Sequence, residues 1–342
     1  MQASFFPASP HTSSDHHTLF PNLRITTLTR TKNNMNKKTP SNLEKGDFED
    51  KQFAANEVAE KVIEQYNEKQ ARVFYKYVMG GGGFDIHYGC FRKSSDTVYE
   101  ASKVTNDRLL TCLDWTTPVT ESSYVLDLGS GHGGISHEIA KRFGCRVMGV
   151  NISPGQNKMN IEEAERLGIE ELVDVTLADF NQGLPDGWEN AFTHVLSCEV
   201  LCHAASKSFI LKEVRRVLKP GGAFVFTDIM GADGANEVVL KDFTDRNATS
   251  KMARPSEYLG LLKETDYVQG SFLDFSSHLV HYFQAMVDQI NKNSDAMIRE
   301  GCSEEYLAKW MKSLTSRVEI QKEYEVFAWG IFTSRIKGLP MH

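Results

Sequence analysis

Residues 125–134 read Val-Leu-Asp-Leu-Gly-Ser-Gly-His-Gly-Gly and decide the fold of this 342-residue chain. The stretch begins as an apolar run, turns through a glycine cluster and opens a helical pattern at 134–143. Gly129, Gly131 and Gly134 have the spacing G-x-G-x-x-G, in which glycines let the backbone turn tightly and approach a ligand closely. We therefore expect the strand, loop and helix that begin a nucleotide-binding α/β fold.

Asp127 narrows the class of ligand, because it lies at the end of the predicted strand, two residues before the first glycine. A carboxylate there disfavours a pyrophosphate and suits a cationic ligand. S-adenosylmethionine carries both a sulfonium and an ammonium group. The pattern therefore indicates a methyltransferase rather than a nicotinamide dehydrogenase, and the loop residues predicted to bind the cofactor are Asp127, Gly129, Ser130 and Gly131.

Strand and helix patterns alternate along the middle of the chain. The expected strands are apolar runs, which is typical of a parallel sheet covered on both faces. The fold class is therefore α/β, with a doubly wound, seven-stranded, Rossmann-like sheet of the methyltransferase type. Its strands are expected at 124–128, 146–151, 172–177, 192–197, 223–229, 267–275 and 324–334, the last one antiparallel, and its main helices at 134–143, 154–167 and 206–218.

The segments around this sheet differ in composition. Residues 1–43 hold twelve Ser or Thr, five Lys or Arg and a single acid, Asp15. This composition is typical of an organellar transit peptide or of an untargeted disordered tail, and we expect it to lie outside the fold. The other predicted units are an N-terminal helical lid at 44–112, the cofactor-binding core at 120–230, a helical cap or substrate region inserted at 231–320, and a terminal strand region at 321–342.

Composition excludes several classes of protein. No run of about 18 apolar residues is present, so a membrane span is not expected. The formal charge of −7 argues against a nucleic-acid partner held by bulk charge. The six cysteines form no C-x-x-C pair, and Cys198, Cys202 and His203 lack a suitably spaced fourth ligand, so no metal site is expected. Reduced thiols predict an intracellular protein, either cytoplasmic or organellar.

Polar residues follow the next strands, at the edge where a doubly wound sheet binds its ligand. Asn151 stands where many methyltransferases carry an acid for the ribose, and an amide can still donate and accept hydrogen bonds. Asp179 can accept a hydrogen bond from an adenine amino group. The tip of the fourth strand should face the sulfonium. The residues predicted to bind the cofactor here are Asn151, Ile152, Gln156, Asp179, Phe180 and Cys198.

The motifs together resemble class I S-adenosylmethionine-dependent methyltransferases over residues 120–230. Two flanking motifs are more specific. Asp85-Ile86-His87-Tyr88-Gly89, after a glycine run, is similar to the GGEDIHxG signature of sarcosine/dimethylglycine N-methyltransferases. Residues 272–282 resemble the DxSxHLxxHY stretch of the same family. The resemblance covers about 280 residues of the chain.

This resemblance implies further site residues. The N-terminal helical region would fold over the cofactor, with Tyr75, Ile86 and His87 at its methionine end. Tyr66 and His203 match a Tyr–His pair that closes the active site in the related phosphobase enzymes. For the substrate, aromatic faces suit a methylated ammonium and arginine suits a carboxylate. The candidates for these two tasks are Tyr88, Tyr282, Arg246 and Arg254.

The predicted function is S-adenosylmethionine-dependent N-methylation of sarcosine and dimethylglycine to glycine betaine. The expected partner is thus a small-molecule amine, and the sequence is compatible with either a monomer or a homodimer. The alternatives are a phosphoethanolamine methyltransferase, which needs several cations around a phosphate, and a sterol, tocopherol or lipid C-methyltransferase, which needs a large apolar pocket. An NAD-dependent oxidoreductase would need an acid at Asn151, and a non-catalytic binding module would not need both sets of motifs.

Overall fold

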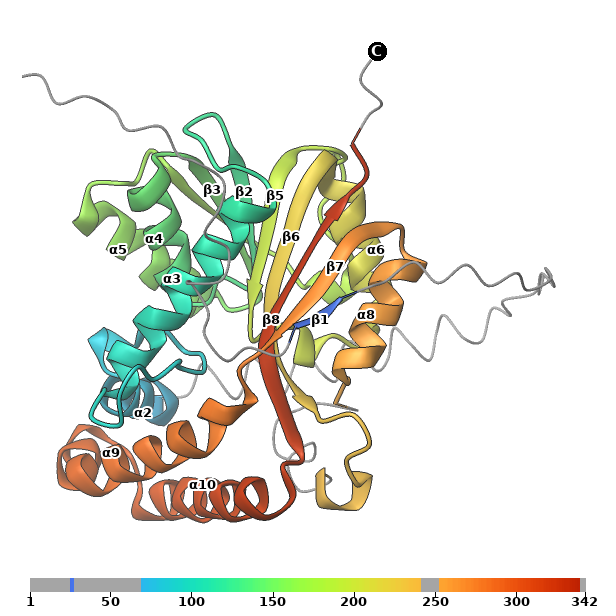
Figure 1. Ribbon diagram of the computed structural model, residues 1–342. Helices are drawn as coiled ribbons and strands as arrows, with labels where there is room; N and C mark the ends of the chain where they lie inside the picture. The colour runs from blue at the N-terminus through green and yellow to red at the C-terminus, as the bar shows by residue number, and fades with distance from the viewer. Residues whose placement is uncertain (1–24, 28–68, 241–251, 339–342) are drawn as a thin grey trace, which may run out of the picture.

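The computed structural model describes residues 25–27, 69–240 and 252–338, and a single mixed sheet forms its centre (Figure 1). Five strands run parallel, as their apolar sequences predict. They are β2 (Tyr124–Leu128), β3 (Arg146–Asn151), β4 (Val173–Leu177), β5 (Phe192–Cys198) and β6 (Leu218–Gly231).

The other side of the sheet is antiparallel. β8 (Phe327–Ile336) pairs with β6 and with β7 (Tyr267–Asp274), which gives the seven-stranded sheet that the sequence predicts. A further short strand, β1 (Ile25–Thr27), pairs antiparallel with β7, so the order is β1-β7-β8-β6-β5-β2-β3-β4. The expectation that residues 1–43 take no part in the fold is therefore wrong at β1, because the outer edge of β7 offers unpaired backbone groups.

Helices cover both faces of the parallel strands (Figure 1). Side chains along a strand alternate between faces, so Val125 belongs to one hydrophobic core and its neighbour Leu126 to the other. This alternation explains why the strands read as continuous apolar runs. The first core packs against α3 (Val98–Thr116), α4 (Gly134–Phe143) and α5 (Pro154–Leu167), and the second against α6 (Lys207–Val217) and α8 (Pro255–Glu264).

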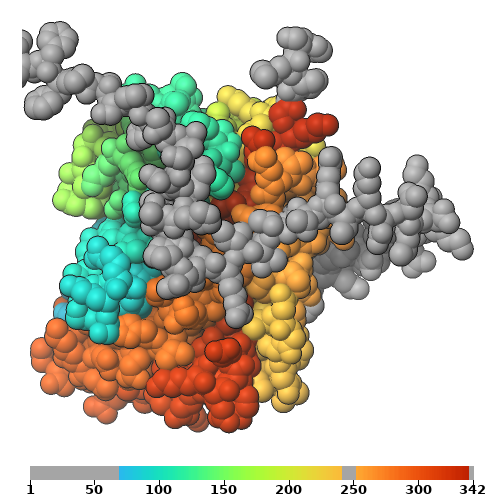
Figure 2. All heavy atoms as spheres, viewed as in Figure 1, coloured from blue at the N-terminus to red at the C-terminus, as the bar shows by residue number. Residues whose placement is uncertain are grey.

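Three more helices gather below the sheet as drawn: α2 (Lys69–Val78), α9 (Leu279–Glu300) and α10 (Glu304–Tyr324). The ring of Phe74 stacks on Trp310 at 4.6 Å between centroids, and Lys76 Nζ lies 2.8 Å from Glu300 Oε2. In the space-filling view, the cyan residues that follow α2 lie against the orange helix α9 (Figure 2). None of the helices in the described ranges is long and apolar enough to cross a membrane.

The region expected as one helical cap, 231–320, therefore has two parts. Its first part supplies α8 and β7, which belong to the layers of the sheet. Its second part supplies α9 and α10, which join α2. Residues 44–68 of the predicted lid and 241–251 of the predicted cap lie outside the described residues.

We predict that deletion of residues 1–43 leaves cofactor binding unchanged and lowers the thermal unfolding midpoint by only a few degrees. The physical reason is that β1 pairs with β7 through three residues at the edge of the sheet. Calorimetry with and without S-adenosylhomocysteine measures both quantities. Phe332→Ala is the comparison, because Phe332 stacks on Phe226 and Phe272 at 4.6 Å and its loss should cost about 3–5 kcal/mol. Lost binding in a truncated protein that still unfolds cooperatively would contradict the prediction.

Candidate active site

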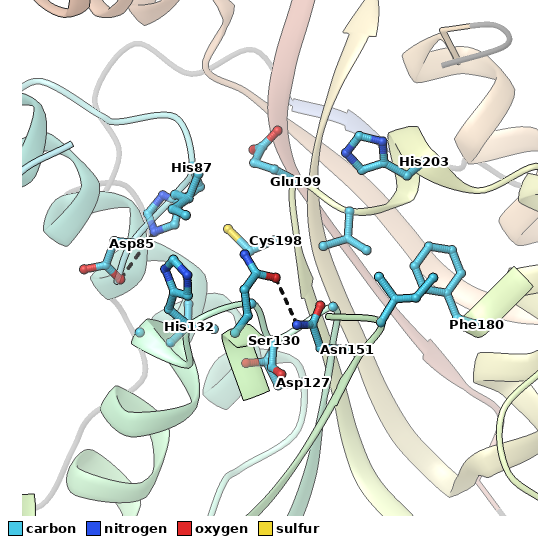
Figure 3. Close-up of a pocket in the computed structure, with 18 of the residues that line it drawn as sticks. Asp85, His87, Asp127, Ser130, His132, Asn151, Phe180, Cys198, Glu199 and His203 are labelled. Atoms are coloured by element: carbon cyan, nitrogen blue, oxygen red, sulfur yellow. Dashed lines mark hydrogen bonds and ion pairs between the residues drawn. The ribbon is translucent and has the colours of Figure 1, made fainter. Parts of the chain in front are cut away.

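A pocket lies at the carboxyl ends of the parallel strands, where open α/β sheets bind ligands (Figure 3). Most residues predicted to bind the cofactor line it, although they come from five separate segments of the chain. They are Ile86, His87, Asp127, Gly129, Ser130, Gly131, Asn151, Ile152, Gln156, Asp179, Phe180 and Cys198, together with the predicted catalytic residue His203.

The glycine loop is fixed by its own backbone. The N–H groups of Gly129 and Ser130 both donate to the carbonyl oxygen of Val150 on β3, at 2.8 and 3.0 Å. Gly129 has φ +81°, and a Cβ there would lie 2.4 Å from Cγ2 of Val200. Only glycine therefore fits this turn without displacing the loop after β5.

Two carboxylates and an amide pair lie near this loop. Burial raises the pKa of Asp127 to about 6, and its Oδ2 accepts a hydrogen bond of 2.5 Å from Ser136. Asn151 Nδ2 donates to Gln156 Oε1 at 3.0 Å, so Asn151, which is expected at the ribose, and Gln156, which is also predicted to bind the cofactor, lie side by side. Asp179 accepts from the backbone N–H of Asn181 at 2.9 Å and thus also stabilises the turn that carries Phe180.

Four of the predicted site residues lie elsewhere. Tyr75 packs in α2 with its ring 5.6 Å from Phe74, and the rings of Tyr88 and Tyr282 meet edge to face at 4.9 Å without lining the pocket. Tyr282 still supports the site, because its hydroxyl donates to the carbonyl oxygen of His87 at 3.0 Å.

Arg254, the fourth residue, caps α8 instead of reaching the pocket. Its guanidinium donates to the carbonyl oxygens of Ala232 and Ala235 and pairs with Glu237. A cation engaged by three partners is poorly placed to hold a substrate carboxylate. The other predicted arginine, Arg246, and the predicted catalytic Tyr66 lie outside the described residues.

The Asp85–His87 pair determines the charge at one end of the pocket. His87 Nδ1 lies 3.1 Å from the carbonyl oxygen of Tyr88 and must donate to it, so Nε2 faces Asp85 Oδ1 at 3.7 Å. Burial lowers the pKa of His87, but Asp85 outweighs burial and the net pKa is raised. Lys103 at 2.8 Å and Asn106 at 2.8 Å hold the Asp85 carboxylate ionised.

Glu199 also lines the pocket, although it is not among the predicted site residues. It follows β5 directly and has φ +58°, a left-handed conformation that is strained for a residue other than glycine. Burial, with help from Asp228, raises the pKa of Glu199 to about 8. Its Oε1 accepts from the indole N–H of Trp329 at 2.5 Å. The sequence does indicate this position, because Glu199 is an acidic residue directly after β5, much as Asp179 is an acidic residue two positions after β4.

Enclosed polar atoms of the pocket fit a polar, charged ligand. Four of them have no hydrogen-bond partner among the described residues, which is rare for buried groups unless a ligand or water completes them. They are Nε2 of His87, Oγ of Ser130, Nε2 of His132 and Oε2 of Glu199. Donors, acceptors and a carboxylate around one pocket match a cofactor that carries an ammonium, a carboxylate and a sulfonium.

Comparison with known proteins agrees with this geometry. Residues 126–226 match the family model described as a methyltransferase domain. The chain is 30% identical over 279 residues to the sarcosine/dimethylglycine N-methyltransferase of Aphanothece halophytica, a match that covers 81% of this chain and 97% of the relative. The chain belongs to the sarcosine/dimethylglycine N-methyltransferase family.

Two further matches support this membership. The chain is 32% identical over 271 residues to the glycine/sarcosine/dimethylglycine N-methyltransferase of Actinopolyspora halophila, a match over 79% of this chain that spans only 46% of that longer protein. A solved structure from Galdieria sulphuraria, assigned as a sarcosine dimethylglycine methyltransferase, is 28% identical with a TM-score of 0.70 and covers 77% of this chain and 97% of its own. The protein is thus a methyltransferase with S-adenosyl-L-methionine as cofactor.

For the glycine loop we predict that Gly129→Ala weakens S-adenosylhomocysteine binding at least tenfold, because the new methyl group pushes Val200 into the pocket. Isothermal titration calorimetry measures the dissociation constant. Gly168→Ala is the matched control, since φ is +69° there but no atom lies within 4 Å of the added Cβ. Equal affinities in the two variants would mean that the turn does not shape the pocket.

For the ion pair we predict that Asp85→Asn lowers the pKa of His87, because burial then acts without the opposing carboxylate. In the wild type, the pair should stabilise the fold below about pH 6.5 and lose this contribution as pH rises through the raised pKa of His87. NMR titration of the imidazole, assigned with His87→Asn, measures the shift. An unchanged pKa in the Asp85 variant would contradict the pairing.

Proposed function

We propose that this protein N-methylates sarcosine and dimethylglycine and that glycine betaine is its final product. Membership of the family supports the proposal, as does the agreement of the Asp85–Tyr88 and 272–282 motifs with that family. The observation that carries the choice of substrate is Glu199, a carboxylate that faces the cofactor pocket with one oxygen enclosed and unpartnered among the described residues.

A carboxylate in this position favours a cationic amine over an apolar acceptor. Glu199 costs free energy to bury as an anion, and a positively charged ligand beside it reduces that cost. A sterol or another lipid would leave the carboxylate without compensation. Cys198, beside it in the pocket, is the residue that sequence reasoning expects near the sulfonium.

A phosphorylated amine is less suitable. The described residues that line the pocket include no lysine or arginine, so a doubly charged phosphate would find only histidines. The single carboxylate of sarcosine or dimethylglycine needs fewer hydrogen-bond donors than a phosphate does. Arg246 remains the predicted partner of that carboxylate, because Arg254 is engaged at the start of α8.

The residues would divide the work of an in-line methyl transfer. When bound, S-adenosylmethionine supplies an electrophilic methyl group, so the protein needs mainly to align the amine with it. Glu199 would accept a hydrogen bond, or the proton itself, from the ammonium of the substrate. His203 lines the same pocket, and burial lowers the pKa of its imidazole to about 4, so at neutral pH it is an uncharged ring that would accept a hydrogen bond and not the proton itself. Tyr88 and Tyr282 do not line the pocket, so they would act indirectly, with Tyr282 holding the carbonyl group of His87 in place.

We predict that Glu199→Gln lowers kcat/KM for dimethylglycine by about 10- to 100-fold, the usual effect of losing a hydrogen bond to a charged group. The affinity for S-adenosylhomocysteine should stay within about threefold. Glu213→Gln is the control, because Glu213 pairs with Arg216 on the helix α6 and does not line the pocket. Unchanged kinetics would remove Glu199 from substrate recognition.

The choice of acceptor is tested by mass spectrometry of the products from glycine, sarcosine, dimethylglycine and phosphoethanolamine. We expect glycine betaine from the two methylated amines and little product from glycine, because each buried methyl group adds about 0.8 kcal/mol. Phosphoethanolamine should not react. If it is the best acceptor in a side-by-side assay, the proposed substrate is wrong although the family is not.

A further inference from the structure

Two histidines at one end of the pocket make the same type of hydrogen bond but have neighbours of different charge. His87 is 7% exposed and His132 is 3% exposed. Each places Nδ1 against a backbone carbonyl oxygen, that of Tyr88 at 3.1 Å for His87 and that of Gly83 at 2.7 Å for His132. A carbonyl can only accept, so Nδ1 carries the proton in both rings and Nε2 is left to face the pocket.

The surroundings of Nε2 give the two rings different charges. His87 Nε2 faces the ionised carboxylate of Asp85, which favours an imidazolium. His132 has no carboxylate partner among the described residues that line the pocket beside it. Burial and the guanidinium of Arg72 on α2 lower its pKa below the ordinary value. At neutral pH, His132 is therefore an uncharged ring with a lone pair on Nε2.

Both rings lie at the same end of the pocket. Figure 3 draws His87 and His132 together on one side, and Phe180 and His203 on the other. The contacts agree, because an added Cβ at Gly134 in the glycine loop would lie 2.4 Å from Asp85 Oδ1 and 2.7 Å from the carbonyl oxygen of Phe84. The segment that carries His87 is thus packed against the loop that carries His132. Phe180 directly follows Asp179, which is predicted to bind the adenine, so the histidines lie at the opposite, amino-acid end.

We propose that His132 is a cofactor ligand whose Nε2 accepts a hydrogen bond from the α-ammonium of S-adenosylmethionine, while the Nε2–H of His87 donates to the α-carboxylate. Each enclosed nitrogen thereby obtains the partner that its protonation state requires. Two histidines in different protonation states thus distinguish the ammonium from the carboxylate of the cofactor. His132 also connects the cofactor to Gly83, and hence to the glycine turn that follows α2. The proposal rests on the cofactor and not on the identity of the methyl acceptor.

Asparagine substitutions test this directly. The Nδ2 of asparagine can take the place of histidine Nδ1, so His132→Asn and His87→Asn can keep the bonds to Gly83 and Tyr88 while they remove only the pocket-facing nitrogen. Thermal unfolding of the ligand-free variants reports whether the fold is kept. His132→Gln, which carries an amide near the position of Nε2 but loses the Gly83 bond, should restore part of the affinity. Calorimetry then measures the binding of three ligands: S-adenosylhomocysteine, its analogue without the carboxylate, and its analogue without the ammonium.

We expect the two substitutions to have opposite effects on the two analogues. His132→Asn should weaken binding of S-adenosylhomocysteine and of the analogue without carboxylate by at least tenfold, but leave the analogue without ammonium within about threefold. His87→Asn should do the reverse for the two analogues. A His132→Asn variant that binds all three ligands like the wild type, or that loses affinity equally for all three, would overturn the proposal. Because no acceptor is present, these outcomes are independent of the proposed substrate.

Discussion

The tight turn between β2 and α4 is the constraint on which the site depends. Two successive N–H groups, of Gly129 and Ser130, converge on the carbonyl oxygen of Val150, and this arrangement requires a left-handed backbone at Gly129. The turn brings Asp127, the first residues of α4 and the loop after β5 to one point. A larger side chain at Gly129 would meet Val200, so the same geometry that shapes the cofactor loop also sets the position of the neighbouring residue Glu199.

The protonation of the carboxyl groups in the pocket depends on their burial and on their hydrogen-bond partners. Burial raises the pKa values of Asp127 and Glu199, to about 6 and about 8, because each carboxylate has few partners. Asp85 behaves in the opposite way, because Lys103, Asn106 and His87 all favour its ionised form. Carboxyl groups of different proton affinity thus line a pocket that would hold a cofactor with both cationic and anionic groups. The pocket can recognise such a ligand without a lysine or arginine among its described lining residues.

The segment between α2 and α3 belongs to the site as much as the sheet does. Gly83 accepts a hydrogen bond from His132, Asp85 packs on Gly134, and Tyr282 from α9 supports the carbonyl group of His87. These contacts join the helices α2 and α9 to the glycine loop through hydrogen bonds and packing. A change in the position of these helices would therefore be felt at the amino-acid end of the cofactor pocket, where His87 and His132 lie.

The sequence by itself determined the sheet and most of the pocket lining, because both depend on local patterns. Apolar runs, the glycine loop and polar residues after strands recur at fixed positions along each strand-and-helix unit, so Asp127, Asn151 and Gln156 could be predicted. Only the tertiary structure decided what depends on side chains from distant segments. It placed Arg254 against α8, put Tyr88 and Tyr282 behind His87, and added β1 to the edge of β7. The charge of His87 likewise depends on Asp85, Lys103 and Asn106, and the role of Glu199 on burial beside Trp329, which lies 130 residues away in the chain. Packing brings such groups together, and no local pattern in the sequence records it.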